Sequence, residues 1–347
     1  MADQLGVALL GYGLAGRSFH APLIGATPGL VLRHVVSRQR ERIASEHPEV
    51  RISEDVATAL ADPAIDAVVI ATPNDQHAAQ AIAALDAGKH VLVDKPFALD
   101  TAQARRVLDH AHARGLTVTA FHNRRHDGEF LTLRRLLAED VLGEVAEFHS
   151  HFDRHRPLVR DRWREQATPG AGLWFDLGPH LLDQALVLFG MPHAISVDLL
   201  AQREGALGDD YFHATLHYPR MRAHLHAGSL VPAHGLRLAV HGHRASYLKH
   251  GLDVQEDQLR AGMAPGAAGW GEDPRTGTLT RIGEDGKPVS TPIPTLPGDY
   301  RATYAAFAAA ARGDGVPDVS GEQLLQVMQL LETGARSAAS GQRIVLD

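Results

Sequence analysis

Three polar residues have the types and the context needed to move a proton and stabilise a developing negative charge. Asp176 and His180 stand four residues apart, so on a helix their side chains share one face. An imidazole titrates near neutrality and can take a proton from a hydroxyl group. The ammonium group of Lys95 can stabilise the alkoxide that such a proton loss creates. On spacing alone, however, an Asp/His pair of this kind is more often a salt bridge on a helix surface.

The surroundings of Lys95 indicate that it is more than a surface lysine. It follows the apolar run at 90–93, which predicts a buried strand, and it precedes Pro96. Open α/β sheets bind their ligands at the carboxyl ends of the strands. Proline disfavours a helical conformation at the residue before it, and the bond between the two can be cis. We therefore expect Lys95 on an extended or turn backbone at a ligand-binding edge of a sheet.

A glycine pattern at residues 11–16 predicts a dinucleotide site. It follows an apolar segment at 6–10 and opens a predicted helix at 18–26, which is the context that gives G-x-G-x-x-G its meaning. The first glycine allows a tight turn, the second lets the backbone approach a pyrophosphate, and the third allows close helix packing. The predicted cofactor contacts in this loop are Gly11, Tyr12, Gly13, Leu14, Ala15 and Gly16. The alternative is a glycine turn that binds nothing.

The end of the second predicted strand, at 31–36, favours NADP as the cofactor. The strand is followed by Ser37 and Arg38, with no carboxylate before Glu41. A carboxylate at this place would bind the ribose 2′-hydroxyl of NAD and repel the 2′-phosphate of NADP. A hydroxyl and a guanidinium would instead hydrogen-bond to that phosphate and neutralise it. NAD stays the alternative, because Arg38 could also stack on adenine or face solvent.

Strand-like and helical segments alternate over the first 122 residues. The predicted strands lie at 6–10, 31–36, 66–71, 90–93 and 116–121, and the predicted helices at 18–26, 75–87 and 101–113. This alternation indicates a parallel sheet with crossover helices, as in an α/β Rossmann domain.

Beyond residue 123 the pattern changes to strands with fewer helices. Strands are predicted at 145–152, 195–203, 212–218, 222–229 and 237–240, helices at 131–138, 173–189, 300–311 and 321–337, and an irregular excursion at 262–297. Such a pattern is typical of an α+β domain with an open-faced, largely antiparallel sheet. We predict a dinucleotide-binding Rossmann domain over 1–122 and a substrate-binding and oligomerisation domain over 123–347, with the catalytic cleft between them.

Longer motifs make the chain resemble the Gfo/Idh/MocA family of oxidoreductases over almost its whole length. They are A-T-P-N at 71–74 with His77, D-K-P at 94–96, and G-A-G-L-W-F-D-L-G-P-H at 170–180. Segments 11–22, 122–125, 162–164, 176–186 and 210–213 resemble the NADP-dependent scyllo-inositol dehydrogenase subgroup most. One departure is Asp94, where the family usually has Glu. The shorter side chain could loosen a hydrogen bond near the nicotinamide ribose without removing the chemistry.

The resemblance implies roles for particular residues. It makes His180 the general base, Asp176 the group that positions a substrate hydroxyl and tunes the imidazole, and Lys95 the group that polarises the oxygen. The further cofactor contacts are Thr72, Pro73, Asn74, His77, Asp94, Lys95, Pro96, Asn123, Trp163 and Arg164. The predicted substrate contacts are Lys95, Asp176 and His180, together with Tyr300. Arg154 and His155 are added from a basic run that could bind substrate hydroxyls or a phosphate, with a solvated loop as the alternative.

The expected activity is that of an NADP-dependent oxidoreductase acting on CH–OH donors. It would interconvert a ring secondary alcohol of a cyclic polyol and its ketone, with scyllo-inositol as the leading substrate. One alternative within the class is another sugar. Two alternatives outside it are a non-catalytic NADP-binding sensor on the same fold and a redox-neutral glycosidase that oxidises its substrate transiently.

The composition excludes several other classes. The chain has 347 residues, 44% of them hydrophobic, a net charge of -7 and no cysteine. These values are typical of a globular protein without disulfides or thiolate metal sites, and they suggest neither a nucleic-acid nor a membrane partner. No apolar stretch approaches the roughly 18 residues of a membrane span. With no signal peptide evident, we expect a cytoplasmic protein.

Paired histidines and the open sheet raise two further questions. His149/His151, His224/His226 and His241/His243 have the spacing that places two side chains on one face of a strand, where they could bind zinc. The sequence shows no third ligand, so no metal is predicted, and these strands are interpreted as a polar sheet face or a subunit interface. An open sheet would leave an apolar face exposed to water unless a second subunit covered it. We therefore predict a homodimer or homotetramer.

Overall fold

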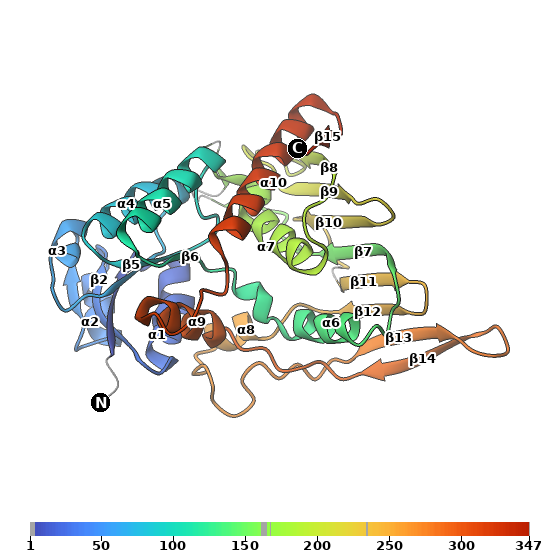
Figure 1. Ribbon diagram of the computed structural model, residues 1–347, viewed down its shortest axis with the longest axis horizontal. Helices are drawn as coiled ribbons and strands as arrows, with labels where there is room; N and C mark the ends of the chain where they lie inside the picture. Colours follow the sequence, from blue (N-terminus) through green and yellow to red (C-terminus); the bar gives the residue numbers. More distant parts are fainter. Residues whose placement is uncertain (1–3, 161–164, 167, 234, 347) are drawn as a thin grey trace. The chain divides into compact units, whose positions relative to one another are not determined.

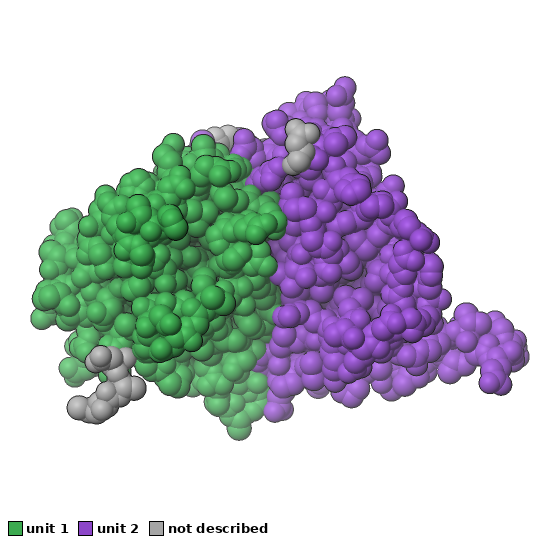
Figure 2. Space-filling view, in the orientation of Figure 1, with its two compact units in different colours: residues 1–126, 255–270, 299–328 green, residues 127–254, 271–298, 329–347 purple. Residues whose placement is uncertain are grey.

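The computed structural model describes residues 4–160, 165–166, 168–233 and 235–346. The chain forms two compact units, which Figure 2 shows in two colours. Unit 1 comprises Met1–His126, Gln255–Trp270 and Asp299–Met328, and unit 2 comprises Asp127–Val254, Gly271–Gly298 and Gln329–Asp347. Unit 1 therefore contains two segments from late in the chain in addition to its first 126 residues.

Unit 1 is built on a six-stranded parallel sheet with the order β3-β2-β1-β4-β5-β6. Its strands are β1 (Leu5–Leu10), β2 (Leu30–Val36), β3 (Arg51–Ser53), β4 (Ala67–Ile70), β5 (His90–Val93) and β6 (Val118–Ala120). The order reverses direction at β1 and β4, which is where this class of sheet binds dinucleotides. The predicted Rossmann architecture is confirmed.

Helices cover both faces of this sheet, as continuous apolar strands require. They are α1 (Ala21–Ala26), α2 (Arg40–Glu46), α3 (Val56–Leu60), α4 (His77–Asp86), α5 (Thr101–Arg114), α8 (Gln255–Arg260) and α9 (Arg301–Arg312), with short turns η2 (Asn74–Gln76) and η3 (Asn123–His126). Figure 1 shows α4 and α5 on one side of the sheet and α1 and α9 on the other. Gly115, in the left-handed conformation at φ 64°, ends α5.

The helix after the glycine loop is wider than the predicted α-helix. Residues Gly16–His20 form a π-helical segment, η1, that continues into α1. Pro22, at the start of α1, has no backbone N–H to donate to the preceding turn. Such π segments are frequent at functional sites.

Unit 2 is built on a nine-stranded sheet with the order β14-β13-β12-β11-β7-β10-β9-β8-β15. The strands are β7 (Val145–His151), β8 (Ala194–Leu200), β9 (Tyr211–His217), β10 (Arg222–Gly228), β11 (Leu236–Gly242), β12 (Ser246–His250), β13 (Gly277–Ile282), β14 (Pro288–Ile293) and β15 (Ile344–Val345). Only the β10/β7 pair is parallel among these strands. The predicted α+β class with a largely antiparallel sheet is therefore also confirmed.

Two helices of unit 2 matter for the site. They are α6 (Gly128–Ala138) and α7 (Gly172–Phe189), and α7 packs on β9 and β10. The ring of Trp174 on α7 meets Phe212 on β9 edge-on, with centroids 5.1 Å apart. A last helix, α10 (Gly321–Ser340), contributes residues to both units. No helix among the described residues is long and apolar enough to cross a membrane.

The segment predicted as an irregular excursion at 262–297 contains a β-hairpin, so that prediction is wrong in part. Strands β13 and β14 pair from Gly277↔Ile293 to Ile282↔Pro288, and Figure 1 shows the hairpin at the edge of the sheet. Every residue of β14 is exposed or only partly buried, so the strand lacks the alternation by which strands are recognised. Its prolines are compatible with an edge strand, where the N–H group they lack is not needed for pairing.

Candidate active site

The three glycines of the loop after β1 have three different environments. Gly11 has φ +94°, and a Cβ built on it would lie 2.6 Å from the carbonyl oxygen of Ala71. A Cβ on Gly16 would lie 2.1 Å from the carbonyl oxygen of Gly11. At Gly13, in contrast, a Cβ would meet nothing within 4 Å. The first and third glycines thus close the turn, while the second opens onto free space, as backbone that must approach a pyrophosphate should.

Tyr12, between the first two glycines, fixes the loop to helix α2. The side chain is buried, and its hydroxyl donates a 2.7 Å hydrogen bond to the Glu46 carboxylate. Arg17 pairs with the same carboxylate at 2.6 Å. Burial raises the pKa of Tyr12 well above its usual range, and the hydrogen bond to Glu46 adds to the effect. Tyr12 therefore positions the loop through its side chain and offers only backbone to a ligand.

The residues after β2 present a hydroxyl and a guanidinium at the surface. Ser37 is partly buried and Arg38 is exposed. Gln39 turns the chain back to the glycine loop, because its side-chain amide donates to the carbonyl of Tyr12 at 2.8 Å. Ser37 and Arg38 are thereby held beside the glycine loop, at the position that selects between NAD and NADP.

His77 joins the loops that follow β4 and β5. It is 1% exposed, and its ring nitrogens lie 2.8 Å from the carbonyl oxygen of Pro96 and 2.9 Å from that of Thr72. The Thr72 hydroxyl donates to Gln80, Asn74 is buried, and Pro73 is exposed. The imidazole therefore positions both loops through their carbonyls.

Lys95 lies immediately after β5, as the sequence predicts, and the Lys95–Pro96 bond is cis. The side chain of Lys95 is partly buried, and its backbone N–H donates to the Asp94 carboxylate at 2.8 Å. The other carboxylate oxygen of Asp94 lies 3.8 Å from Nε2 of His20. Asp94 thus fixes the backbone from which Lys95 extends.

His20 and Tyr304 are site residues that the sequence analysis missed. His20 is fully buried in η1, with Nδ1 2.6 Å from the Tyr304 hydroxyl and its ring 4.6 Å from that of Phe121. Burial raises the pKa of Tyr304 well above its usual range, and the charge of Asp94 adds to this. The chain Tyr304–His20–Asp94 leads from α9 to the residue before Lys95. His20 lies inside the motif at residues 11–22, whereas no local sequence pattern indicates Tyr304.

Asn123 and Tyr300 lie in unit 1 but differ in what they can reach. Asn123 begins η3, just beyond β6, and is 4% exposed. Tyr300 is 0% exposed, its hydroxyl accepts from Arg124 at 3.0 Å, and its backbone N–H donates to Gln255. This geometry does not support the prediction that Tyr300 faces the substrate, because the whole side chain belongs to the core of unit 1.

Helix α7 carries Asp176 and His180 one turn apart, as the sequence predicts. Asp176 is partly buried, and His180 is 6% exposed. The helix is capped by a distant residue: the Asp209 carboxylate accepts from the Trp174 N–H at 2.6 Å, and its carbonyl accepts from Leu173. Burial raises the pKa of Asp209 to about 6 in spite of these hydrogen bonds.

Gly172 is required by this cap. Its φ is +89°, and a Cβ on it would lie 2.1 Å from Oδ1 of Asp209. The structure thus places the Asp209 carboxylate directly against this glycine. The glycine therefore lets a carboxylate reach the amino end of the helix that carries the predicted base.

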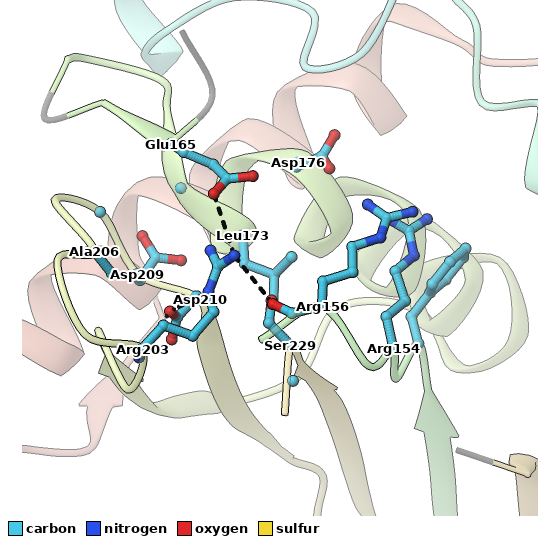
Figure 3. Close-up of a pocket in the computed structure, with 14 residues that line it drawn as sticks. Arg154, Arg156, Glu165, Leu173, Asp176, Arg203, Ala206, Asp209, Asp210 and Ser229 are labelled. Carbon is cyan, nitrogen blue, oxygen red and sulfur yellow. Dashed lines mark hydrogen bonds and ion pairs between the residues drawn. The ribbon is translucent and has the colours of Figure 1, made fainter. Parts of the chain in front are cut away.

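A pocket in unit 2 is lined by Asp176 together with arginines from the segment after β7 (Figure 3). Figure 3 shows the Arg154 and Arg156 side chains extending from the same segment of the chain. Other lining residues include Phe152, Leu173, Arg203, Asp209, Asp210 and Ser229. Arg154 lies over the Phe152 ring, 4.9 Å from its centroid. The pocket thus combines the Asp176 carboxylate on α7 with the guanidinium groups of Arg154, Arg156 and Arg203, beside the carboxylates of Asp209 and Asp210.

His155, predicted as a substrate contact, is not among the residues that line this pocket. It is exposed and pairs with Leu230 in an isolated β-bridge, so its side chain points away from those of its two neighbours. Arg156, the next residue, does line the pocket. Trp163 and Arg164, predicted as cofactor contacts, lie outside the described residues.

Two buried arginines support the pocket, and neither was predicted. Arg203 bonds the Asp210 carboxylate at 2.7 Å and the carbonyls of Arg156 and Leu158, and it pairs with Glu165 at 3.2 Å. It thereby holds the segment that carries Arg154 and Arg156.

The second buried arginine that supports the pocket is Arg237, on β11. It is 1% exposed and donates to Glu129 on α6, Ser150 on β7 and Gln184 on α7, at 2.9, 2.7 and 2.8 Å. Its guanidinium lies 5.7 Å from the Phe152 ring centroid. One cation therefore ties the helix of Asp176 and His180 to the sheet.

Comparison with known families agrees with both units. Residues 5–122 match the oxidoreductase family with an NAD-binding Rossmann fold, and residues 134–346 match the C-terminal alpha/beta domain of the same family. The chain belongs to the Gfo/Idh/MocA oxidoreductase family. It is accordingly an oxidoreductase with an NAD-binding domain, of a family that includes dehydrogenases.

Individual relatives extend over the whole chain. The uncharacterized oxidoreductase YdgJ of Escherichia coli is 50% identical over 338 residues, which cover 97% of each chain. The scyllo-inositol 2-dehydrogenase (NADP(+)) IolW of Bacillus subtilis is 35% identical over 347 residues, covering 99% of this chain and 97% of IolW. The structure of the YPO2259 oxidoreductase from Yersinia pestis matches with a TM-score of 0.95 and 47% identity, covering 100% of this chain and 98% of that one.

Proposed function

We propose that this oxidoreductase uses NADP to oxidise a ring secondary alcohol of a cyclic polyol to its ketone, reversibly, with scyllo-inositol as the leading substrate. The observation that carries the proposal is the face of α7, where Asp176 opens into a pocket one helical turn from His180. The full-length similarity to IolW, whose name gives both scyllo-inositol and NADP, supports the choice of substrate and cofactor.

The glycine loop fits a dinucleotide. Gly13 opens onto free space between two glycines whose Cβ positions are filled by backbone, so the cradle has room only where a ligand would approach. Gly11 to Gly16 would hold the pyrophosphate at the start of the helix that begins there. Arg38, exposed after β2, would bind a 2′-phosphate. Thr72, Pro73, Asn74, Asp94, Pro96 and Asn123 would surround the rest of the cofactor, with His77 positioning two of their loops.

The chemistry assigned to the protein is proton transfer and charge stabilisation. Bound NADP supplies the hydride acceptor. His180 takes the proton of the reacting hydroxyl at an imidazole nitrogen, and Asp176 accepts a hydrogen bond that orients the substrate. Lys95 donates a hydrogen bond to the same oxygen and stabilises its negative charge until the carbonyl has formed. Arg154 and Arg156 would hold further substrate hydroxyls.

A panel of substrates tests this function. The full-length chain is incubated with NADP or NAD and with inositols, aldoses and their phosphates, and the absorbance of the reduced nicotinamide is followed. We expect the highest rate with scyllo-inositol and NADP, and Arg38→Ala should reduce the preference for NADP over NAD by roughly tenfold or more. No rate with any polyol, despite tight NADPH binding, would instead favour a sensor.

Two further predictions accompany this function. We expect the chain to assemble into a homodimer or homotetramer, which sedimentation can measure. A single species of 37.4 kDa, the mass of one chain, would contradict this assembly. Assembly was expected because an exposed apolar sheet face would be covered by a second subunit. On β7, β9 and β10, however, the sheet face opposite α7 carries histidines, so that face is not apolar there. The expected location of the enzyme is the cytoplasm.

A further inference from the structure

Histidines collect on the face of the unit 2 sheet that points away from α7. They are His149 and His151 on β7, His213 and His217 on β9, His224 and His226 on β10, and His241 on β11. Register explains the collection, because His149 pairs with His224 and His151 pairs with His226 in the parallel β7/β10 ladder. The proposed reaction uses none of these side chains.

Within this face, His151 and His226 share a buried carboxylate. Asp153, two residues beyond His151, is 8% exposed. Its Oδ1 lies 2.7 Å from Nδ1 of His226, and its Oδ2 lies 3.3 Å from Nδ1 of His151. The same carboxylate accepts the N–H of Gly228 at 3.1 Å. The fold thus brings together one histidine from each of two sequence pairs, His149/His151 and His224/His226, and adds a carboxylate as a third group.

The three side chains offer the ligand set that zinc-type ions prefer. One nitrogen from each imidazole and one carboxylate oxygen lie within 4.8 Å of one another. Zinc binds such ligands at about 2.0–2.2 Å, which places them roughly 3.3 Å apart in a tetrahedral site. Both imidazoles are only partly buried, and metal binding would require them to rotate toward one another.

The arrangement of the cluster also suits a cation. Both oxygens of the buried Asp153 carboxylate face an imidazole nitrogen. A divalent ion bound to it would replace the two imidazole hydrogen bonds and compensate the buried negative charge.

We propose that His151, Asp153 and His226 form a binding site for one divalent transition-metal ion of the zinc type. The side chains of His151 and His226 are 23% and 18% exposed, so the site opens to the face of the sheet. Three protein ligands leave one position of a tetrahedral ion for water or for another ligand. The site is separate from the residues proposed for hydride chemistry and needs no change in their roles.

The test uses the full-length chain without a histidine tag, freed of metal with a chelator. Zinc binding is measured by competition with a chromophoric chelator, and cobalt is used as a second probe because its visible bands report the ligand geometry. We expect one ion per chain and a visible cobalt spectrum of low symmetry. His226→Gln and Asp153→Asn should each weaken zinc binding at least tenfold.

A matched control separates a discrete site from a generally metal-binding surface. His149→Gln removes an imidazole from the same strand and face, where it bonds Glu147 instead of Asp153. We expect this variant to bind zinc within about twofold of the parent chain. An equal loss in His149→Gln and His151→Gln, or no stoichiometric binding, would overturn the proposal and leave Asp153 as a structural hydrogen-bond acceptor.

Because Asp153 also holds Gly228, its variant could fold poorly. Thermal unfolding with and without zinc is therefore measured for each variant. His151→Gln, at the more exposed edge, should retain the fold but lose the increase in Tm that zinc gives the parent. A variant that keeps this increase would contradict the role of its side chain as a ligand.

Discussion

The two units position their candidate functional residues in different ways. In unit 1 the candidate residues follow strands of one parallel sheet, and short motifs such as residues 11–16 and 94–96 contain most of them. In unit 2 the pocket depends on buried contacts between residues far apart in the chain, with Arg203 and Arg237 at their centres. Substitution in unit 1 should therefore remove function while the fold persists, whereas substitution in unit 2 should affect both.

The largest expected effect comes from the unit 1 side of this comparison. Lys95→Ala removes the ammonium group that stabilises the alkoxide, but it leaves the backbone contact to Asp94 in place. The kcat should fall by roughly 10²–10⁴-fold, with little change in NADPH binding or in Tm. Steady-state kinetics and fluorescence titration with NADPH check this. Unchanged turnover would refute the role of Lys95.

In unit 2, Arg237→Ala should weaken the fold itself. It leaves the Glu129 carboxylate buried without its cation, which costs about 3–5 kcal/mol in the free energy of unfolding. Arg244→Ala is the control, because the Arg244–Asp140 pair is exposed and should contribute at most about 1 kcal/mol. Urea unfolding measures both, and similar values for the two variants would contradict the difference drawn between the units.

Gly172→Ala tests the cap of α7. The new methyl group would meet the Asp209 carboxylate on a backbone with positive φ, so we expect a loss of about 2–3 kcal/mol in unfolding free energy and a reduced kcat. Gly88→Ala has a similar φ of +74° but open space around its Cβ. It should cost about 1 kcal/mol and leave kcat unchanged. Equal effects at both positions would show that the cap is unimportant.

The protonation of Asp209 should also make the free energy of unfolding depend on pH. Its pKa of about 6 in the folded chain lies above that of an unfolded Asp, so the folded state binds more protons between about pH 4 and pH 6. The stability that Asp209 contributes is therefore present at low pH and lost as the pH rises through 6, by up to about 3 kcal/mol. Urea unfolding at several pH values measures how the free energy of unfolding changes with pH. This change should be absent in Asp209→Asn and present in the control variant Asp140→Asn.

The sequence predicted unit 1 better than unit 2 for a physical reason. Strand, glycine turn and helix follow one another within about 20 residues, so local spacing determines where Gly11 to Gly16 and Lys95 lie. The motif at 170–180 also placed Asp176 and His180 on one helix correctly. Local reasoning did not foresee that Tyr300 is buried in the core of unit 1 or that His155 does not line the pocket, because both depend on distant partners.

The residues that no pattern revealed act over long separations. Arg237 joins β11 to α6, β7 and α7, and Asp209 caps a helix that begins 37 residues earlier in the chain. Tyr304 reaches His20 across 284 positions. A buried arginine or tyrosine resembles any other in the sequence, and only the fold shows what it holds.

The fate of the hydrogen on the reacting carbon tests the central claim most directly. The full-length chain is incubated with NADP and scyllo-inositol that carries deuterium on its ring carbons, and both products are analysed by mass spectrometry. We expect one deuterium in the reduced cofactor for each ketone formed, and in Lys95→Ala a rate of deuterium transfer that falls by the same factor as kcat. Reduced cofactor without deuterium, or deuterium retained in a substrate that never becomes a ketone, would contradict it.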